Sequence, residues 1–318
     1  MRITYSVVIP VYNEDEVLPR LYERLAAVME QLEEPYEIIF VNDGSQDRSY
    51  EIMKEISRKD NRVKIIDLSR NFGHQIAITA GLDYAAGDAV MLMDADLQDP
   101  PEVLPGFVEK WREGFDIVYA IRKKRKENIL KRLCYKLFYR ILRTISDVDI
   151  PLDSGDFALL SKQAVSAIRS ARESNRFVRG IRSWVGFRQV GIEYERVERY
   201  AGEVKYTLPR LMKLAIDGMV SFSSVPLRFI AYLGFTISFL SFVYIIYLIF
   251  LKLFTDVSPQ GWTSVMVSIF FVGGIQLTVL GIIGAYIGRI YDEVKCRPLY
   301  LIKRSIGFDN PDGQDKQD

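Results

Sequence analysis

The sequence predicts an α/β domain with a mostly parallel sheet, followed by two membrane-spanning helices. In the first half of the chain, short apolar runs alternate with helical patterns of about 10 to 15 residues, which is typical of a sheet covered by helices on both faces. Two long uncharged stretches follow nearer the C-terminus. A chain of 318 residues with 49% hydrophobic and 26% charged residues can form a sizeable core beside these helices.

Four successive strand–turn–helix units build the predicted sheet. The expected strands are Tyr5–Pro10, Glu37–Val41, Val63–Asp67 and Ala89–Met93, and the expected helices run through Leu18–Val28, Asp47–Lys59, the segment up to Ala86 and the segment from Pro101. The alternation in Val190–Val197 predicts one more strand. Because ligands of such sheets bind beyond the carboxyl ends of the strands, we expect the turns 10–14, 42–45 and 94–98 to meet at one edge.

The turn after the fourth strand has the composition of a metal site. Asp94 and Asp96 stand one residue apart, and Gln98 follows before a proline pair. These side chains offer the hard oxygen ligands that Mg²⁺ or Mn²⁺ prefers, and Mg²⁺ is commonly held by one or two carboxylates plus substrate phosphates. An acidic pair of this kind also serves as a solvated turn or a helix cap. The convergence of three polar strand ends favours the metal site.

Composition excludes some classes of function. A formal net charge of +1 gives no indication of nucleic-acid binding. The two cysteines, Cys134 and Cys296, are too few for a disulfide framework and lack metal-ligand spacing, which indicates a reducing compartment. The segment Met1–Tyr5 has no signal-peptide pattern, so we expect the α/β domain to stay in the cytoplasm.

The two uncharged stretches predict transmembrane helices at 229–252 and 265–289. The run from Phe229 to Leu251 would span roughly 34 Å as a helix, enough to cross a bilayer. The loop between the helices, 255–264, has no Lys or Arg, whereas basic residues flank the outer ends of both helices. The positive-inside rule then places both termini in the cytoplasm, as in a multi-pass protein of the cell membrane.

The motifs of the α/β part resemble a known family. In order they are Val-Val-Ile-Pro-Val-Tyr-Asn-Glu (7–14), Asn-Asp-Gly-Ser (42–45), Asn-Phe-Gly (71–73) and Asp-Ala-Asp-Leu-Gln-Asp-Pro-Pro-Glu (94–102). This set resembles the inverting family 2 glycosyltransferases with the Rossmann-like GT-A fold. Within them it is similar to the polyprenyl-phosphate glycosyltransferases, the group of dolichol-phosphate mannose synthase and the bactoprenol glucosyltransferases. The resemblance covers roughly residues 5–230 and implies a GT-A domain at 1–205.

The resemblance also implies site residues. Pro10, Tyr12, Glu14 and Asp43 would contact the base and ribose of a nucleotide sugar, while Asp94, Asp96 and Gln98 would hold a divalent metal on its diphosphate. Asn42 stands where the family often has Asp. In its Gly-Asp-Phe context, Asp156 is the expected catalytic base. A lipid phosphate has a second pKa near ~6 and is largely ionised already, so Asp156 could also act by positioning the acceptor.

Basic residues provide candidates for holding the acceptor phosphate. They are Arg122, Arg125, Arg199, Lys205 and Arg210, with surface salt bridges as the alternative role for each. A basic amphipathic helix is predicted at about 126–146, where it would lie on an anionic membrane surface. A juxtamembrane helix is expected at 206–228 and a cytoplasmic tail at 291–318, disordered from Asp309.

The sequence therefore predicts a membrane enzyme that transfers a sugar, with UDP-glucose as the first candidate donor, to undecaprenyl or a similar polyprenyl phosphate in the cell envelope. Three alternatives stay open: a GDP-mannose-dependent mannosyltransferase, a processive polysaccharide synthase and a non-catalytic partner of a lipid-glycan flippase. The synthase is disfavoured because Arg179–Trp184 does not match its Gln-x-x-Arg-Trp motif. Gly281, Gly284 and Gly288 would permit either self-association or packing between the two helices.

Overall fold

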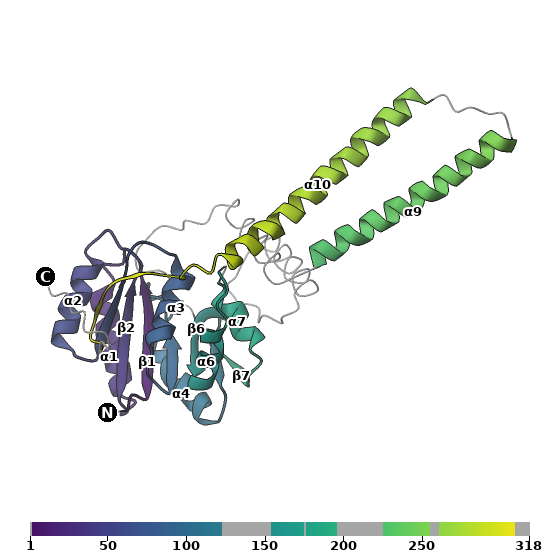
Figure 1. Ribbon diagram of the computed structural model, residues 1–318. Coiled ribbons are helices and arrows are strands. Elements are labelled where there is room, and N and C mark those ends of the chain that lie inside the picture. Colours follow the sequence, from purple (N-terminus) through teal and green to yellow (C-terminus); the bar gives the residue numbers. More distant parts are fainter. Residues whose placement is uncertain (1, 123–153, 175, 196–224, 255–260, 309–318) are drawn as a thin grey trace. The chain divides into compact units, whose positions relative to one another are not determined.

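The computed structural model describes residues 2–122, 154–174, 176–195, 225–254 and 261–308 (Figure 1). The described residues form an α/β unit, from 2–195 together with 297–308, and a helical unit from 225–296. The predicted interfacial helix at 126–146, most of the segment 206–228 and the tail from Asp309 lie outside the described residues.

The α/β unit is built on one sheet, whose described strands are β1 Tyr5–Val11, β2 Tyr36–Asn42, β3 Val63–Leu68, β4 Ala89–Leu92, β5 Ile117–Arg122, β6 Ser154–Ser161, β7 Gln189–Tyr194 and β8 Ile302–Ile306. Its helices are α1 Leu18–Glu30, α2 Ser49–Lys59, α3 His74–Tyr84, the 3₁₀ turn η1 Pro101–Val103, α4 Leu104–Arg112, α6 Lys162–Ser170 and α7 Val178–Trp184. The five strands predicted from the sequence are confirmed to within a few residues. Strands β5, β6 and β8 were not predicted.

The strand order is β7-β5-β6-β4-β1-β2-β3-β8. Strand β1 pairs in parallel with β2 and β4, β2 with β3, and β5 with β7, which confirms the mostly parallel α/β fold. Strand β6 is antiparallel to both of its neighbours, and β8 is antiparallel to β3. One edge of the sheet therefore contains the carboxyl ends of β1, β2, β4 and β5 together with the amino end of β6.

Both faces of the sheet are covered by helices. Successive side chains of a strand point to opposite sides, so neighbouring residues of one strand pack against different helices. Val7 and Ile9 of β1 belong to an apolar cluster that includes buried residues of α1, α2 and α4. Val8 belongs to a second cluster with buried residues of α3, α6 and α7. Strands buried on both faces read as continuous apolar runs, which explains why the parallel strands could be predicted from the sequence.

The chain returns to the sheet after the helical unit. Strand β8 adds to the free edge of β3, the backbone N–H of Ser69 donates to the Leu301 carbonyl at 2.9 Å, and the Tyr300 hydroxyl donates to Asp83 at 2.8 Å. The sequence predicted only a tail for 291–318. A strand of five residues with three polar side chains gives too weak an alternation to be recognised.

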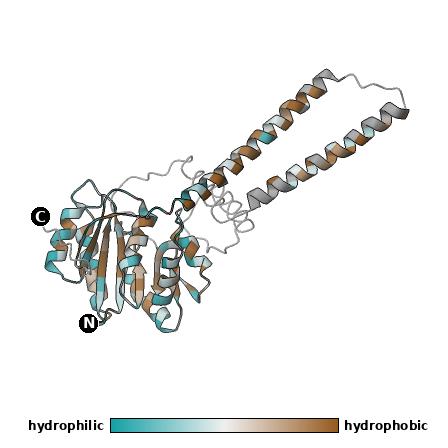
Figure 2. Ribbon diagram, in the orientation of Figure 1, coloured by the Kyte–Doolittle hydropathy of each residue, from teal (hydrophilic) through white to brown (hydrophobic). Residues whose placement is uncertain are grey.

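The helical unit contains two long helices, α9 Val225–Phe254 and α10 Trp262–Val294. Among the described residues, one helical stretch is long and apolar enough to cross a membrane, Val267–Val294 in α10, with a mean hydropathy of 2.1. Figure 2 shows its predominantly hydrophobic colouring. The apolar stretch of α9 is shorter, Gly234–Tyr244. The predicted span at 265–289 thus coincides with an apolar helix that meets this requirement.

A buried ion pair fastens the amino ends of the first strands. The Glu37 carboxylate is 1% exposed, accepts hydrogen bonds from Ser6 Oγ at 2.5 Å and the Ala86 N–H at 2.8 Å, and contacts Lys64 Nζ at 2.7 Å. It therefore links β1, β2, β3 and the turn before β4. Removing one partner of such a group leaves the others buried and unpaired.

We predict that Glu37→Gln destabilises the protein by roughly 3 kcal/mol, because the Lys64 ammonium loses its counter-charge. The measurement is urea unfolding of the detergent-solubilised chain, followed by fluorescence. Glu55→Gln, at an exposed position on α2, is the matched control and should change stability by less than about 0.5 kcal/mol. Equal unfolding midpoints for the two variants would contradict the prediction.

Candidate active site

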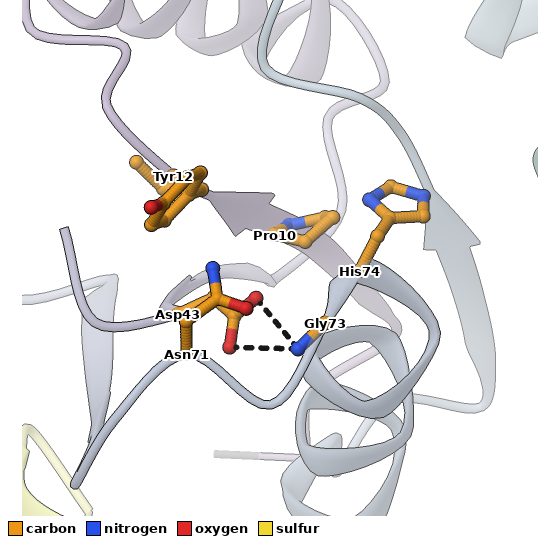
Figure 3. A pocket seen from close by; sticks show the side chains of 7 residues that line it. Pro10, Tyr12, Asp43, Asn71, Gly73 and His74 are labelled. Atoms are coloured by element: carbon orange, nitrogen blue, oxygen red, sulfur yellow. Dashed lines mark hydrogen bonds between the residues drawn. The ribbon is translucent and has the colours of Figure 1, made fainter. Parts of the chain in front are cut away.

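A pocket of about 200 Å³ lies at the carboxyl edge of the sheet (Figure 3). Its lining residues come from the ends of β1 and β2, from the loop between β3 and α3 and from the first residue of α3: Pro10, Val11, Tyr12, Asp43, Asn71, Gly73 and His74. Three of the four residues predicted to bind a nucleotide, Pro10, Tyr12 and Asp43, meet in this pocket. Glu14 is not among the lining residues, and its carbonyl accepts the N–H groups of Val17 and Leu18 where α1 begins.

Asp43 shapes the pocket wall. Its carboxylate accepts the backbone N–H of Phe72 at 2.7 Å and that of Gly73 at 3.0 Å, the latter drawn in Figure 3. Burial raises the pKa of Asp43, and these two hydrogen bonds counteract the rise. The carboxylate thus fixes the loop 69–73 in place, and its remaining lone pairs can still accept a hydrogen bond from a ligand.

The neighbouring Asn42 has a structural partner. Its Nδ2 donates to Asp67 Oδ1 at 2.7 Å, and both side chains are buried. Burial raises the pKa of Asp67, whereas the hydrogen bond from Asn42 lowers it. An aspartate at position 42 would place two buried carboxylates side by side. The asparagine avoids this repulsion and donates a hydrogen bond to Asp67 instead.

The antiparallel register of β6 brings Asp156 next to Asp94. Leu92 at the end of β4 pairs with Ala158 of β6; Asp94 follows Leu92 by two residues, and Asp156 precedes Ala158 by two residues on the antiparallel strand. Between them lies His74, whose Nε2 is 3.4 Å from Asp94 Oδ1 and 3.4 Å from Asp156 Oδ2. Because His74 also lines the pocket, the pocket and the acidic site are contiguous.

The acidic site concentrates negative charge. Burial raises the pKa of Asp94 to about 6, and the nearby carboxylates of Asp156, Asp99 and Asp96 add to the rise. Burial alone would also raise the pKa of Asp156, but His74 and two arginines of α7 hold it well below its usual range. For His74, burial lowers the pKa, and the hydrogen bond to Asp156 and the charge of Asp94 outweigh that and raise it. The two carboxylates therefore favour the protonated form of the imidazole between them.

The predicted metal ligands lie in a tight turn. Asp96 Oδ1 accepts the backbone N–H of Gln98 at 3.0 Å, and Leu97 between them has a φ of 56°, a left-handed conformation that a leucine rarely adopts. Such strain clusters at functional sites. In the part of the chain that the structure describes, no three His, Cys, Asp or Glu side chains form a ready-made metal cluster.

The donor chemistry nevertheless fits Mg²⁺ or Mn²⁺. Asp94 and Asp96 supply carboxylates, Gln98 supplies an amide, and a bound diphosphate would complete the oxygen ligands. Burial is the main cause of the raised pKa of Asp94, and the neighbouring carboxylates add to it; a divalent cation would relieve the repulsion among these carboxylates.

Arg122 lies beside the acidic site, at the end of β5. Its Nε donates to the Tyr194 hydroxyl at 3.4 Å, and this hydroxyl donates to Asp99, which follows the predicted metal turn. A side chain at Gly155 would begin 3.0 Å from Arg122 Nη2, so the guanidinium lies close against the start of β6. Arg125, Arg199, Lys205 and Arg210 lie outside the described residues.

The sequence patterns did not identify two groups of residues that belong to the site. His74 is the single histidine and directly follows the Asn-Phe-Gly motif, a signal that could have identified it. Gln75, Arg179 and Arg182 surround Asp156 from α3 and α7. Asp156 does not cap the helix that follows β6, because the Oγ of Ser161 caps α6 by accepting the Ala164 N–H at 3.2 Å.

A mostly parallel α/β sheet with an acidic turn beside a pocket at its carboxyl edge is the arrangement expected of a GT-A-like fold, and comparison with known proteins gives the family. Residues 6–169 match glycosyl transferase family 2, and the chain belongs to this family. It is 52% identical to the uncharacterized glycosyltransferase YkcC of Bacillus subtilis, over 97% of this chain and 96% of that protein. It is 43% identical to the SfII prophage-derived bactoprenol glucosyl transferase of Shigella flexneri, over 94% of this chain and 97% of that protein.

The packing of the pocket loops generates a prediction about two glycines. Gly44 has a φ of 69°, and an added Cβ would lie 2.6 Å from the backbone nitrogen of Asn71. Gly73 has a φ of 98°, but an added Cβ would meet nothing within 4 Å. Alanine is therefore strained by its backbone at both positions and clashes only at position 44.

We expect Gly44→Ala to destabilise the protein by about 1 to 3 kcal/mol more than Gly73→Ala, because the turn after β2 must separate from the loop 69–73. Melting temperatures of the two solubilised variants provide the comparison. A larger loss for Gly73→Ala would show that these loops do not pack as described.

Proposed function

We propose that this chain is a membrane-anchored inverting glycosyltransferase that transfers glucose from UDP-glucose to a polyprenyl phosphate at the cytoplasmic face of the membrane. One observation carries the proposal: His74 lines the pocket and lies 3.4 Å from both Asp94 and Asp156. A nucleotide in the pocket would therefore have its diphosphate directed to the acidic site, where a sugar and its acceptor can meet.

Donor binding is assigned to the pocket. The exposed ring of Tyr12 offers a face on which a base can stack, and Asp43 can accept an N–H of the base. Glucose and the bactoprenol lipid are proposed because relatives such as the Shigella flexneri protein are named bactoprenol glucosyl transferase. Uridine is the base first expected from the resemblance in sequence.

Asp94, Asp96 and Gln98 would hold the divalent cation. When bound, the cation supplies positive charge to the diphosphate as it departs with the electrons of the broken bond. The side chains of the turn keep their role whichever of Mg²⁺ and Mn²⁺ is present, because both prefer oxygen ligands.

The acceptor would attack from the Asp156 side. An oxygen of the polyprenyl phosphate forms a bond to the anomeric carbon while the bond from that carbon to the diphosphate breaks, which inverts the configuration. The acceptor phosphate is largely ionised at neutral pH, and the arginines of α7 and His74 keep the pKa of Asp156 low. We therefore assign Asp156 to orienting the acceptor, with Arg122 as a cation for its phosphate.

The topology of the chain supports two membrane crossings. Strand β8 belongs to the same sheet as β1 to β7, so the residues before α9 and after α10 share one compartment. A chain that crosses a bilayer through α10 must then cross once more before it, and α9 is the long helix of the described residues in that interval. The basic residues at the outer ends of both helices favour a cytoplasmic position for the sheet.

The test is transfer by the purified full chain from a panel of UDP- and GDP-sugars to polyprenyl phosphate, with the lipid product identified by mass. We expect one added hexose with UDP-glucose and Mg²⁺ or Mn²⁺. GDP-mannose as the sole active donor would favour a mannosyltransferase, and long products would indicate a processive synthase. Absence of transfer from every donor would contradict the proposal and favour a non-catalytic role.

The two ends of β4 provide a matched pair of substitutions for the metal turn. Asp96→Asn should reduce transfer by at least ~100-fold, because the metal loses an anionic ligand. Asp88→Asn, before the amino end of β4, removes a surface ion pair with Arg2 and should leave transfer within about two-fold. Full turnover of Asp96→Asn in the presence of metal would exclude the assignment of this turn.

A further inference from the structure

Helix α7 carries two arginines whose surroundings differ. Arg182 is 1% exposed, its Nη1 donates to the Gly155 carbonyl at 3.1 Å and its Nη2 to Ser154 Oγ at 3.3 Å. Its guanidinium also lies over the ring of Tyr119, 5.1 Å from the centroid. These contacts hold the start of β6, so Arg182 supports the backbone on which Asp156 stands.

Arg179 lies one helical turn before Arg182 and faces the carboxylate itself. Its Nε is 3.5 Å from Asp156 Oδ1, and the side chain is 29% exposed. Within the described residues, neither Nε nor Oδ1 has a hydrogen-bond partner. The two groups thus form an ion pair without a hydrogen bond, and a guanidinium has further N–H groups to offer.

Gln75 fixes the other side of the carboxylate. Its Nε2 donates to Asp156 Oδ2 at 3.0 Å, while its Oε1 accepts the N–H of Val178 at 2.8 Å, at the start of α7. This one side chain therefore sets the distance between Asp156 and the helix that carries Arg179. Of the two arginines of α7, Arg179 is therefore the partly exposed one beside a carboxylate whose orientation is already fixed.

We propose that Arg179 binds the phosphate of the polyprenyl phosphate acceptor, in addition to holding Asp156. This inference rests on the function proposed above. A phosphate placed beside the Asp156 carboxylate meets like charge and needs a cation on that side. Arg182 is enclosed and already bonded to backbone and hydroxyl groups, whereas Arg179 is accessible and its planar guanidinium can bind phosphate in a bidentate manner.

The experiment compares Arg179→Met, Arg179→Lys and the wild type as full chains in detergent. Initial rates give kcat and the KM values for donor and acceptor, and UDP affinity serves as the test of correct folding. We expect Arg179→Met to raise the acceptor KM by at least ~10-fold, the loss expected for a hydrogen bond to a charged group, and to leave UDP affinity within about two-fold. Arg179→Lys should recover part of the loss, because lysine keeps the positive charge but lacks the planar guanidinium that binds phosphate through two N–H groups.

Arg172→Met is the matched control. Like Arg179, Arg172 pairs with an aspartate: its Nη1 lies 2.7 Å from Asp83 Oδ2. Asp83 is near the end of α3, away from the acidic site. This variant should leave the acceptor KM unchanged. An equal rise in acceptor KM for Arg172→Met and Arg179→Met would overturn the proposal, since the effect would then follow from any lost surface ion pair.

A second comparison separates phosphate binding from positioning. Affinity for farnesyl phosphate, a short polyprenyl phosphate, is measured by calorimetry for Asp156→Asn with and without Arg179→Met. If Arg179 contacts the phosphate, its removal should still weaken binding by about 10-fold in the Asp156→Asn background. Loss of the effect in that background, or a fall in kcat with unchanged acceptor KM, would restrict Arg179 to positioning Asp156 and overturn the proposal. If the wild type transfers sugar and Arg179→Met has the same acceptor KM as the wild type, the role of Arg179 is refuted and the proposed function stands. If the wild type transfers no sugar, the proposed function is refuted as well.

Discussion

The antiparallel insertion of β6 between β4 and β5 is the constraint on which the site depends. In a purely parallel sheet, the strand beside β4 would present its amino end at the opposite edge. Because β6 runs the other way, its first residues lie at the carboxyl edge, and the register Leu92–Ala158 places Asp156 beside Asp94. A shift by one residue would turn Asp156 to the other face of the sheet. The start of β6 is also the place where Arg182 donates to the Gly155 carbonyl and where the Arg122 guanidinium lies close to Gly155.

Charge balance explains how the same edge can hold both substrates. Four carboxylates lie at or beside the acidic site, those of Asp94, Asp96, Asp99 and Asp156. His74 lies 3.4 Å from two of them, and it is also the side chain shared with the pocket. A diphosphate and a phosphate would add negative charge, so binding either requires cations. In the proposed function, a divalent metal beside Asp94 would supply positive charge for the donor diphosphate, and arginines beside Asp156 would supply it for the acceptor phosphate.

Sequence patterns predicted the elements whose signal is local. Strands β1 to β4 are continuous apolar runs with polar turns, and the acidic turn and the pocket residue Tyr12 follow from them. Strand β6 could not be predicted in this way, because its position depends on pairing with β4 and β5 across a long separation in sequence. The same holds for β8, which follows the helical unit. Arg179 was considered only as part of a motif that did not match, since its importance arises from tertiary contact with Asp156.

We propose that one edge of the sheet binds the donor between the pocket and the acidic turn. The most direct measurement is an experimental structure of the full chain with UDP and Mn²⁺. We expect the base to lie beside Tyr12 and Asp43, and the metal to lie within roughly 2.0–2.3 Å of oxygen atoms from Asp94, Asp96 and the diphosphate. A nucleotide bound at any other edge of the sheet, or a metal that contacts neither aspartate, would contradict it.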